Sequence, residues 1–413
     1  MIDLKNIKSS IKQFFCFYEE NTLNLNVITS MAQSLILIAA LSLFLPYPAT
    51  AAVVSCIGAS FCVLPGTRDK IFSHKGSFIL LIFTLITATV ALCHGNWTGL
   101  IRTGIFAMMI VIYLVARSLN SKKFFEKLLT FLVMGGTFSA VVSSIEFYNN
   151  LGDAKYRCKS FFTNPNFFGI AMVLVIFICA YKFIMDSKGK WVYFTFALIN
   201  ALGLIFSGSM SLWLVLVIGI FLLLLLNHKY KLVALMLGVV AVAIVAIIAV
   251  PSLIPRLKEL SLTFSNRVTI WDFAIKHFKE TPVFGRGFYT YKFLYNLYSP
   301  NDPTIYKASL SHNIILDSLL CHGIVGTGLI FYYIYIFFKG VADCREKLKA
   351  KSESYAISTF IVAVAVTLFF YGLIDTTIIF VQTGMIVLFI ASGIGTEERK
   401  IKQLEESERR KEE

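Results

Sequence analysis

The residues best suited to do chemistry lie in one stretch of the last third of the chain. His312 and Asn313 open a long apolar run, and Gly323 and Gly326 follow after nine intervening residues. The preceding segment, residues 251–311, is the longest non-hydrophobic part of the protein. A histidine between a polar loop and a membrane helix can reach both a water-soluble group and a lipid-borne one. His312 is thus a candidate base for proton transfer, with simple anchoring of the helix end as the alternative.

Three arginines could hold an anion near this histidine. Arg157 stands in a loop with Lys155 and Lys159, just before an Asn-Pro-Asn sequence at residues 164–166. Proline favours the start of a helix there. Arg102 lies a few residues inside a predicted span, where it either lines a polar cavity or reaches back to lipid headgroups. A basic loop that binds anionic headgroups is the alternative for Arg157.

The third arginine, Arg267, precedes a helical pattern. Val268, Trp271, Ile275 and Phe278 fall at offsets 0, 3, 7 and 10, which predicts one apolar face of an amphipathic helix. Arg267 would stand in the first turn, where free backbone N–H groups also favour anions.

Two acidic residues accompany the histidine. Asp317 follows His312 by five residues, roughly 140° around a helix, so the two side chains should not touch. Asp375 ends a later span and should have a partner, for which the three arginines are candidates. His322 is expected to pack inside the helix bundle, and the two glycines to allow close helix packing.

The His-Asn pair with its spaced glycines resembles the signature of the O-antigen ligase family. These membrane glycosyltransferases move a polysaccharide from a polyprenyl diphosphate onto lipid A–core. Other elements resemble the family in the same order, namely Arg157 with Asn-Pro-Asn, Arg267, the turn with Pro282, Gly285 and Gly287, and Asp375. The resemblance covers about residues 155–380.

The chain departs from the family at one turn, Ser207-Gly208-Ser209-Met210. Many relatives place an arginine directly after the Ser or Thr of this turn, where Met210 stands. Either a neighbouring arginine, with Arg102 as candidate, replaces it or the phosphate site is built differently.

The resemblance implies a metal-independent, inverting transferase of the GT-C type without a cofactor. The donor would be undecaprenyl-diphosphate-linked O-antigen, and the acceptor a lipid A–core sugar hydroxyl in the periplasm. His312 and Arg267 would be catalytic. The diphosphate would be bound by Arg157, Arg267 and Arg102. The supporting residues would be Asn313, Asp317 and Asp375.

The composition of the chain indicates that these residues belong to a membrane protein. The chain has 57% hydrophobic and 15% charged residues and a mean hydropathy of +0.74, as expected for a multi-pass membrane protein. About twelve stretches are long and apolar enough to span. They centre near residues 36, 57, 85, 110, 137, 175, 199, 218, 241, 325, 364 and 385. The predicted fold is therefore all-α.

The basic residues predict the orientation. With the N-terminus inside, inside segments hold 26 of the 38 Lys and Arg residues, outside segments hold eleven, and Arg102 lies within a span. The net charge of +14 is then a topology signal and does not require nucleic acid. This orientation places both termini on the inside, and the family resemblance then implies the bacterial inner membrane with the site facing the periplasm. The predicted parts are a cytoplasmic segment (1–26), spans one to nine (27–250), a periplasmic loop with an amphipathic helix (251–311), spans ten to twelve (312–394) and a cytoplasmic tail (395–413).

Alternative functions remain open on the sequence. A polysaccharide polymerase would use the same donor with a glycan acceptor, and a protein-glycosylating transferase is a further variant. A transporter or flippase is the alternative from another class. Transporters usually show internal repeats and polar residues at mid-membrane. Here the charges gather at the outer ends of the spans, which favours surface chemistry.

Overall fold

The computed structural model describes residues 25–64, 66–74, 76–153, 155–185, 189–249, 260–298 and 308–412. In this part every regular element is a helix and no strand is present. The predicted N-terminal segment lies almost wholly outside the described residues, as do two pieces of the predicted loop, 251–259 and 299–307.

The centres of all twelve predicted spans fall inside helices of the described chain. These are α2 (Leu25–Ser42), α3 (Tyr47–Val63), α5 (Ser77–Cys93), α6 (Trp97–Leu119), α7 (Lys122–Asn149), α8 (Pro165–Met185), α9 (Lys190–Ser207), α10 (Met210–Leu226), α11 (Tyr230–Ala249), α14 (Ile314–Ala350), α15 (Ala356–Gly372) and α16 (Val381–Ser392). Among the described residues, α6, α7, α8, α9 and α14 are long and apolar enough to cross a membrane. The count of twelve spans remains a prediction.

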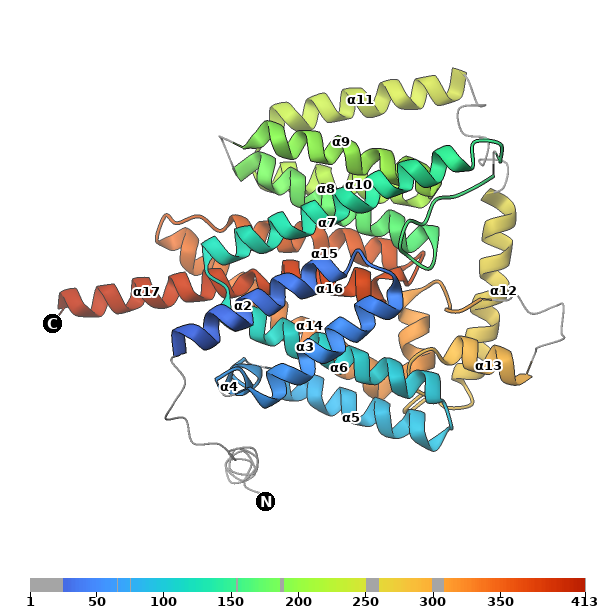
Figure 1. Cartoon of the computed structure of the whole chain (residues 1–413), viewed down its shortest axis with the longest axis horizontal. Helices are drawn as coiled ribbons and strands as arrows, with labels where there is room; N and C mark the ends of the chain where they lie inside the picture. The colour runs from blue at the N-terminus through green and yellow to red at the C-terminus, as the bar shows by residue number, and fades with distance from the viewer. Residues whose placement is uncertain are drawn as a thin grey trace.

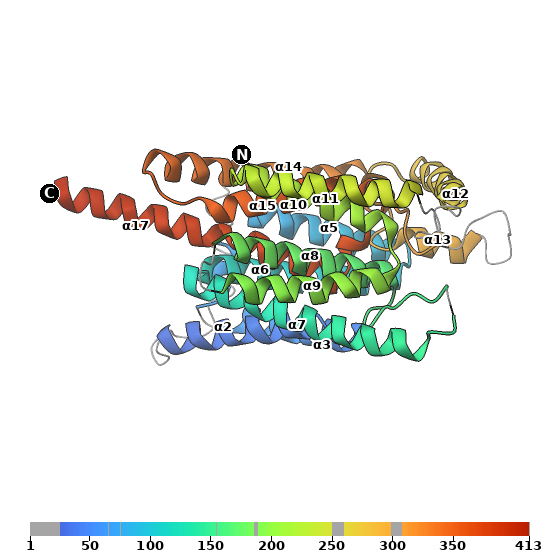
Figure 2. The same ribbon diagram turned by 90° about the horizontal axis from the view of Figure 1, so that it is seen from above.

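The long helices run roughly side by side along the longest axis of the molecule (Figure 1). Successive helices run in opposite directions, so that their connections alternate between two ends. The connections before α3, α6, α8, α10, α14 and α16 gather at one end, called here the His312 end. There α12 (Leu260–Phe278) and α13 (Thr290–Tyr298) lie across the ends of the bundle (Figures 1 and 2). The segments predicted to be outside therefore share one end.

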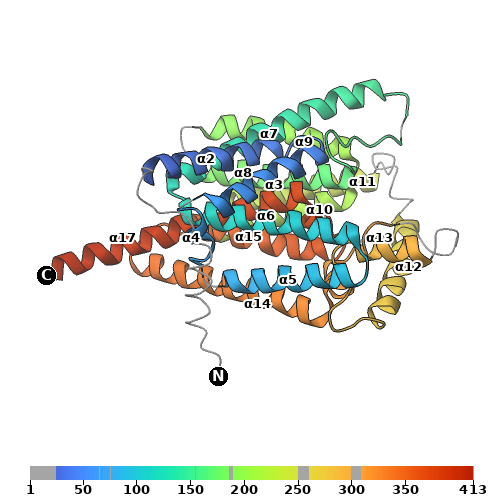
Figure 3. The ribbon, with the colours of Figure 1, turned by 60° about the horizontal axis from the view of Figure 1, so that its bottom comes forward.

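Helix α8 forms the centre of the bundle. Its sequence is apolar on every side, and a helix of that kind is stable in a protein when other helices surround it. Almost every residue from Phe168 to Lys182 is buried. Neighbours α7, α9 and α10 pack against α8, and α5 packs against α14 at the edge of the bundle (Figure 3). The first residues of α8 are thereby held in place at the His312 end.

The opposite end carries the charged C-terminal helix α17 (Ile394–Glu412), which continues outward from α16. Helix α14 also extends past Lys339 to Ala350, so that Lys347 pairs with Glu405 at 2.9 Å. Exposed ion pairs of this kind contribute little to stability. The predicted tail is thus helical.

The side of the membrane reached by each end can be tested with reporters. A reporter active only in the periplasm should be active when fused after Tyr298, at the His312 end, and silent when fused after Lys349, at the opposite end. The physical reason is the excess of basic residues in the connections of the opposite end. Activity of the Lys349 fusion alone would reverse the orientation.

Candidate active site

Asn313 fixes the start of α14 and thereby the place of His312. Its side-chain oxygen accepts hydrogen bonds from the first free N–H groups of the helix, at 3.0 and 3.1 Å, as a helix cap does. Its amide donates to the Leu373 carbonyl at 3.1 Å. This residue therefore joins the start of α14 to the end of α15, and His312 lies at that junction.

Asp317 holds the backbone on the other side of His312. Its Oδ1 accepts hydrogen bonds from both the N–H and the hydroxyl of Ser311, each at 3.0 Å. No hydrogen bond joins it to His312 among the described residues, as predicted. Between these two anchors His312 adopts a φ of +52°, a left-handed conformation that is unusual for a residue with a side chain. Backbone strain of this kind costs about 1–3 kcal/mol and persists where the surroundings enforce it.

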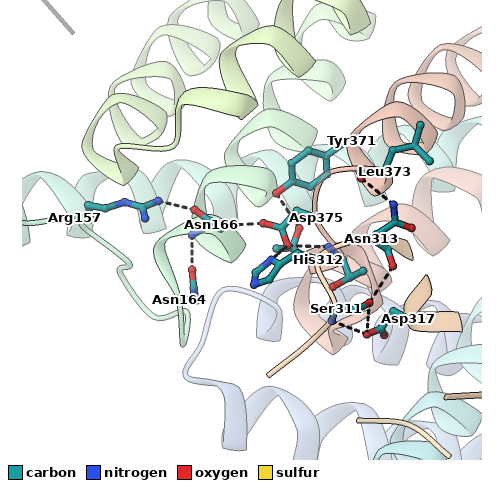
Figure 4. Close-up of polar contacts among 12 residues, drawn as sticks. Arg157, Asn164, Asn166, Ser311, His312, Asn313, Asp317, Tyr371, Leu373 and Asp375 are labelled. Atoms are coloured by element: carbon teal, nitrogen blue, oxygen red, sulfur yellow. Dashed lines mark hydrogen bonds and ion pairs between the residues drawn. The ribbon is translucent and has the colours of Figure 1, made fainter. Parts of the chain in front are cut away.

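Asp375 is the acceptor at the centre of the site (Figure 4). Its side chain is only 2% exposed, and His312 Nδ1 lies 3.1 Å from its Oδ1. The Asn166 amide donates to the other carboxylate oxygen at 3.2 Å, and the Thr376 N–H donates to Oδ1 at 2.8 Å. The Tyr371 hydroxyl also donates to this carboxylate. Leaving a buried carboxylate unpaired would cost several kcal/mol, and these donors offset that cost.

This arrangement fixes how His312 can act. An ionised carboxylate only accepts hydrogen bonds, so in the neutral ring Nδ1 must carry the proton. Nε2 then keeps a free lone pair. Because the His312 side chain is 30% exposed, that lone pair is accessible to a substrate hydroxyl. Arginine was the predicted partner of Asp375, but among the described residues its hydrogen bonds join it to His312, Asn166, Tyr371 and the Thr376 N–H, and Arg157 is linked to it through Asn166.

Arg157 joins the site through Asn166. Its Nη2 donates to Asn166 Oδ1 at 2.5 Å, while its Nε donates to the Ser207 carbonyl at 2.8 Å (Figure 4). The Asn164 side chain accepts from the Asn166 N–H at 2.8 Å, which shapes the predicted break before α8. A continuous chain of hydrogen bonds therefore runs from Arg157 through Asn166 and Asp375 to His312.

The same contacts bring an arginine to the turn that departs from the family pattern. The Arg157 side chain lies against Gly208, so that a Cβ at Gly208 would stand 3.2 Å from Arg157 Cγ. Arg157 thus contacts this turn at Gly208, which stands two residues before Met210 in the sequence. The guanidinium of Arg102, the predicted replacement, lies instead over the rings of Tyr47 and Tyr289, at 4.7 and 4.6 Å.

Arg267 lies on α12, near Tyr371. Its guanidinium is close enough for a long-range electrostatic interaction with the Tyr371 hydroxyl, which hydrogen-bonds Asp375, and among the described residues no hydrogen bond or ion pair joins Arg267 to the site. The helix begins at Leu260, about two turns before Arg267, so the prediction that Arg267 stands in the first turn is wrong. Its guanidinium and not the helix terminus supplies the positive charge here.

The buried face of α12 differs in part from the predicted one. Ile270, Phe273 and Ala274 are buried, and Trp271 and Phe278 of the predicted face pack against the same cluster, whereas Val268 and Ile275 are each 40% exposed. Both faces of this helix are apolar, so periodicity alone cannot choose between them. The choice is made by the surface against which α12 packs, formed by residues of α13 and α14 such as Tyr291, Leu294 and Leu320.

The two glycine motifs meet at a break in α14. Gly323 has φ +62° and ψ −169°, which interrupts the helix. There the Ile324 N–H donates to the Pro282 carbonyl and the Gly287 N–H to the Cys321 carbonyl, both at 2.8 Å. A Cβ at Gly323 would stand 2.3 Å from a backbone oxygen of the turn. Gly323 is therefore needed for the break in the helix and not for the predicted close packing of helices. The turn at Pro282–Gly287 hydrogen-bonds α14 at this break and so supports the first part of that helix, which begins directly after the His312–Asn313 pair.

His322 precedes this break and is buried, as predicted. Its ring lies 4.8 Å from that of Phe83 and 4.6 Å from that of Phe288, and its Nδ1 is 3.4 Å from the Thr87 hydroxyl. It therefore packs within the bundle.

Tyr371 is the site residue that motif reasoning missed. It stands four residues before Asp375, and the Asp375 N–H donates to its carbonyl at 2.9 Å, so both belong to one helical turn. The sequence did contain a signal for this contact, because a tyrosine stands four residues before the acidic residue that ends a predicted span. The role of Asn166 as a donor to Asp375 was likewise not predicted.

Comparison with known proteins adds one finding. The family model described as O-antigen ligase matches residues 194–331, which include Arg267, the turn at Pro282–Gly287, and His312. Arg157 and Asp375 lie outside the matched residues. No curated protein matches the chain. The resemblance to the O-antigen ligase family is therefore confirmed, and residues 194–331 carry the domain of that family.

Proposed function

We propose that this protein transfers an O-polysaccharide from undecaprenyl diphosphate to a sugar hydroxyl of lipid A–core. The reaction would take place at the His312 end, on the periplasmic side of the bacterial inner membrane. The observation that carries the proposal is the pairing of His312 with the buried Asp375, within one hydrogen-bonded chain that also contains Arg157.

His312 would act as the general base. Asp375 holds its Nδ1 proton, and the exposed Nε2 accepts the proton of the acceptor hydroxyl as the oxygen attacks the anomeric carbon. The bond from that carbon to the diphosphate breaks as the new glycosidic bond forms, so the configuration inverts. Tyr371 and Asn166 keep the carboxylate in place during the step.

Fixed positive charges would stabilise the leaving diphosphate. Arg157 and Arg267 approach the same carboxylate region, the first through Asn166 and the second beside Tyr371. Arginine suits this role because its charge is permanent and its donors form a fork that fits phosphate oxygens. Binding two lipid-anchored substrates at one membrane face would supply further acceleration by proximity. Metal independence stays a prediction, which an unchanged rate in excess chelator would support.

Arg267 offers a test of the diphosphate contact. Arg267→Lys keeps the charge but loses the fork, so we expect an impaired rate, and Arg267→Ala should lower it by about 10²–10³-fold, as loss of one electrostatic donor does. The rate is measured with purified protein, donor and acceptor.

Arg286 provides the matched control for this substitution. It is buried and pairs with Glu280 at 2.7 Å, so its role is in the loop and not in the chemistry. Arg286→Lys should keep near-normal activity per folded molecule. Equal losses in Arg267→Lys and Arg286→Lys would mean that the loop requires the guanidinium fork at both positions and that Arg267 makes no contact specific to the diphosphate.

A strain that lacks the protein distinguishes the proposed function from its alternatives. Loss of a ligase leaves bare lipid A–core and polymer on the carrier, whereas loss of a polymerase leaves lipid A–core with one repeat unit. Gel analysis of the lipopolysaccharide separates these patterns. Loss of the carrier-linked polymer from the periplasmic side would instead favour a flippase.

A further inference from the structure

The end of α7 carries a carboxylate that binds the loop leading to α8. Glu146 stands in the last turn of that helix. Its Oε1 accepts a hydrogen bond from the Tyr156 hydroxyl at 2.8 Å, and its Oε2 accepts the N–H groups of Lys159 and Ser160 at 3.2 and 2.7 Å. The bound residues lie on both sides of Arg157 in the sequence. One carboxylate therefore holds the segment that carries Arg157.

The helix alone does not favour an acidic residue at this position. The C-terminal end of a helix carries a partial negative charge, which an acidic side chain in the last turn opposes. The hydrogen bonds from the loop to Glu146 offset this cost. A residue that departs from a local preference and is compensated by other contacts is typical of functional positions.

The loop backbone bends around this carboxylate. Ser160 has a φ of +49°, a left-handed conformation, and its hydroxyl donates to the Ser139 carbonyl of α7 at 3.0 Å. Successive N–H groups that point at one anion, as those of Lys159 and Ser160 do, form a concave site for negative charge. Strained conformations persist where the surroundings enforce them, and here α7 supplies those surroundings.

The same segment also contacts the turn between α9 and α10. The Cys158 N–H donates to the Phe206 carbonyl at 2.9 Å, and Arg157 Nε donates to the Ser207 carbonyl at 2.8 Å. Phe147 of α7 stacks on Phe206, with the ring centroids 4.5 Å apart. The ends of α7 and α9 thus form one support, against which Arg157 is fixed.

This support matters because a fixed charge stabilises a transition state without reorganising during the reaction, whereas a free arginine has many rotamers. We propose that Glu146 is a positioning residue, which holds the segment of residues 156–160 so that Arg157 reaches Asn166 and the leaving diphosphate (Figure 4). Glu146 touches no substrate in this role. The inference rests on the proposed function of Arg157 in glycosyl transfer.

Substitutions at Glu146 test this role by the transfer rate. Glu146→Leu keeps a side chain of similar size and removes both acceptors, so transfer should fall about tenfold or more, as loss of hydrogen bonds to a charged group does. Glu146→Gln should stay closer to the wild-type rate. Its carbonyl can accept the Ser160 N–H, and its amide can donate to the Tyr156 hydroxyl.

A double variant separates positioning from a general contribution to the fold. If Glu146 acts through Arg157, Glu146→Leu should have little further effect on the rate once Arg157→Gln is present. A contribution to folding alone would lower the rate by the same factor in both backgrounds. That additive result would overturn the positioning role.

Trypsin measures the release of Arg157 without any transfer reaction. Cleavage after Arg157 requires its guanidinium to leave its partners and enter the protease. In full-length protein in lipid nanodiscs, Glu146→Leu should raise this cleavage rate about tenfold or more, because the lost hydrogen bonds no longer oppose release. The new N-terminus at Cys158 is quantified by mass spectrometry. Cleavage after Lys351, at the opposite end, reports general unfolding and should not change.

Asp153→Leu is the matched control, because it removes a carboxylate of the same loop that accepts the Lys155 N–H at 2.9 Å within one turn. It should leave cleavage after Arg157 unchanged. No increase of this cleavage in Glu146→Leu, or an equal increase in Asp153→Leu, would overturn the inference. Absence of transfer by the wild type would contradict the proposed function instead, and the cleavage rates would still decide whether Glu146 holds Arg157.

Discussion

Replacement of His312 by alanine is expected to lower transfer by about 10²–10⁴-fold, the usual contribution of a general base. The reason is that Nε2 of His312 is the accessible lone pair of the site, while Asp375 occupies Nδ1. Purified protein, polyprenyl-diphosphate donor and lipid A–core acceptor are mixed in chelator, and the product is followed by gel. Donor binding should survive because the arginines remain.

Two controls separate chemistry from backbone strain. His312 has a positive φ, which asparagine tolerates better than alanine, so His312→Asn should preserve the fold without restoring a base. His322→Ala removes a buried ring and should lower thermal stability more than the rate per folded molecule. Near-normal product from His312→Asn would contradict the catalytic role and leave His312 as an anchor of the helix end.

The sequence predicted the helical bundle well because membrane helices depend on the length and position of apolar runs. Every predicted span centre falls in a helix, and the segments assigned to the outside share one end. These features follow from local composition. They do not require knowledge of which helices become neighbours.

The site was predicted less completely because its contacts join segments far apart in the chain. The motifs identified His312, Asn313 and Asp375 individually, but the pairing of His312 with Asp375 spans 63 residues. The contact of Asn166 with Asp375 spans 209 residues, and no periodicity encodes it.

Two misassigned details have the same origin. Gly323 resembles a packing glycine, and only the neighbouring turn at Pro282–Gly287 makes it a break in the helix. Likewise, α12 has apolar residues on two faces, and its partners α13 and α14 decide that Ile270 and Phe273 are buried. Tertiary packing overrides a local pattern wherever the pattern permits more than one arrangement.

The buried carboxylate gives the second large expected effect. Asp375→Asn should lower transfer by up to about 10⁴-fold, the loss known for the same exchange in a His–Asp pair of a protease. An amide at this position can donate to Nδ1 of His312. The ring proton would then move to Nε2, where it blocks the base. One carboxylate oxygen would be replaced by an NH₂ group, so the donors Asn166 and Tyr371 would have fewer acceptors at this position.

Asp317→Asn is the control that makes this result specific. Asp317 is also buried and close to His312 in sequence, but one of its oxygens accepts both bonds from Ser311, and an amide oxygen can keep them. We therefore expect Asp317→Asn to retain most activity and Asp375→Asn to lose it at similar thermal stability. If the two variants lost activity equally, activity would require a buried negative charge near His312 and not a specific contact of Asp375. If Asp375→Asn alone lost activity while donor binding persisted, the function of Asp375 would be to keep the proton on Nδ1 and leave Nε2 free to accept one.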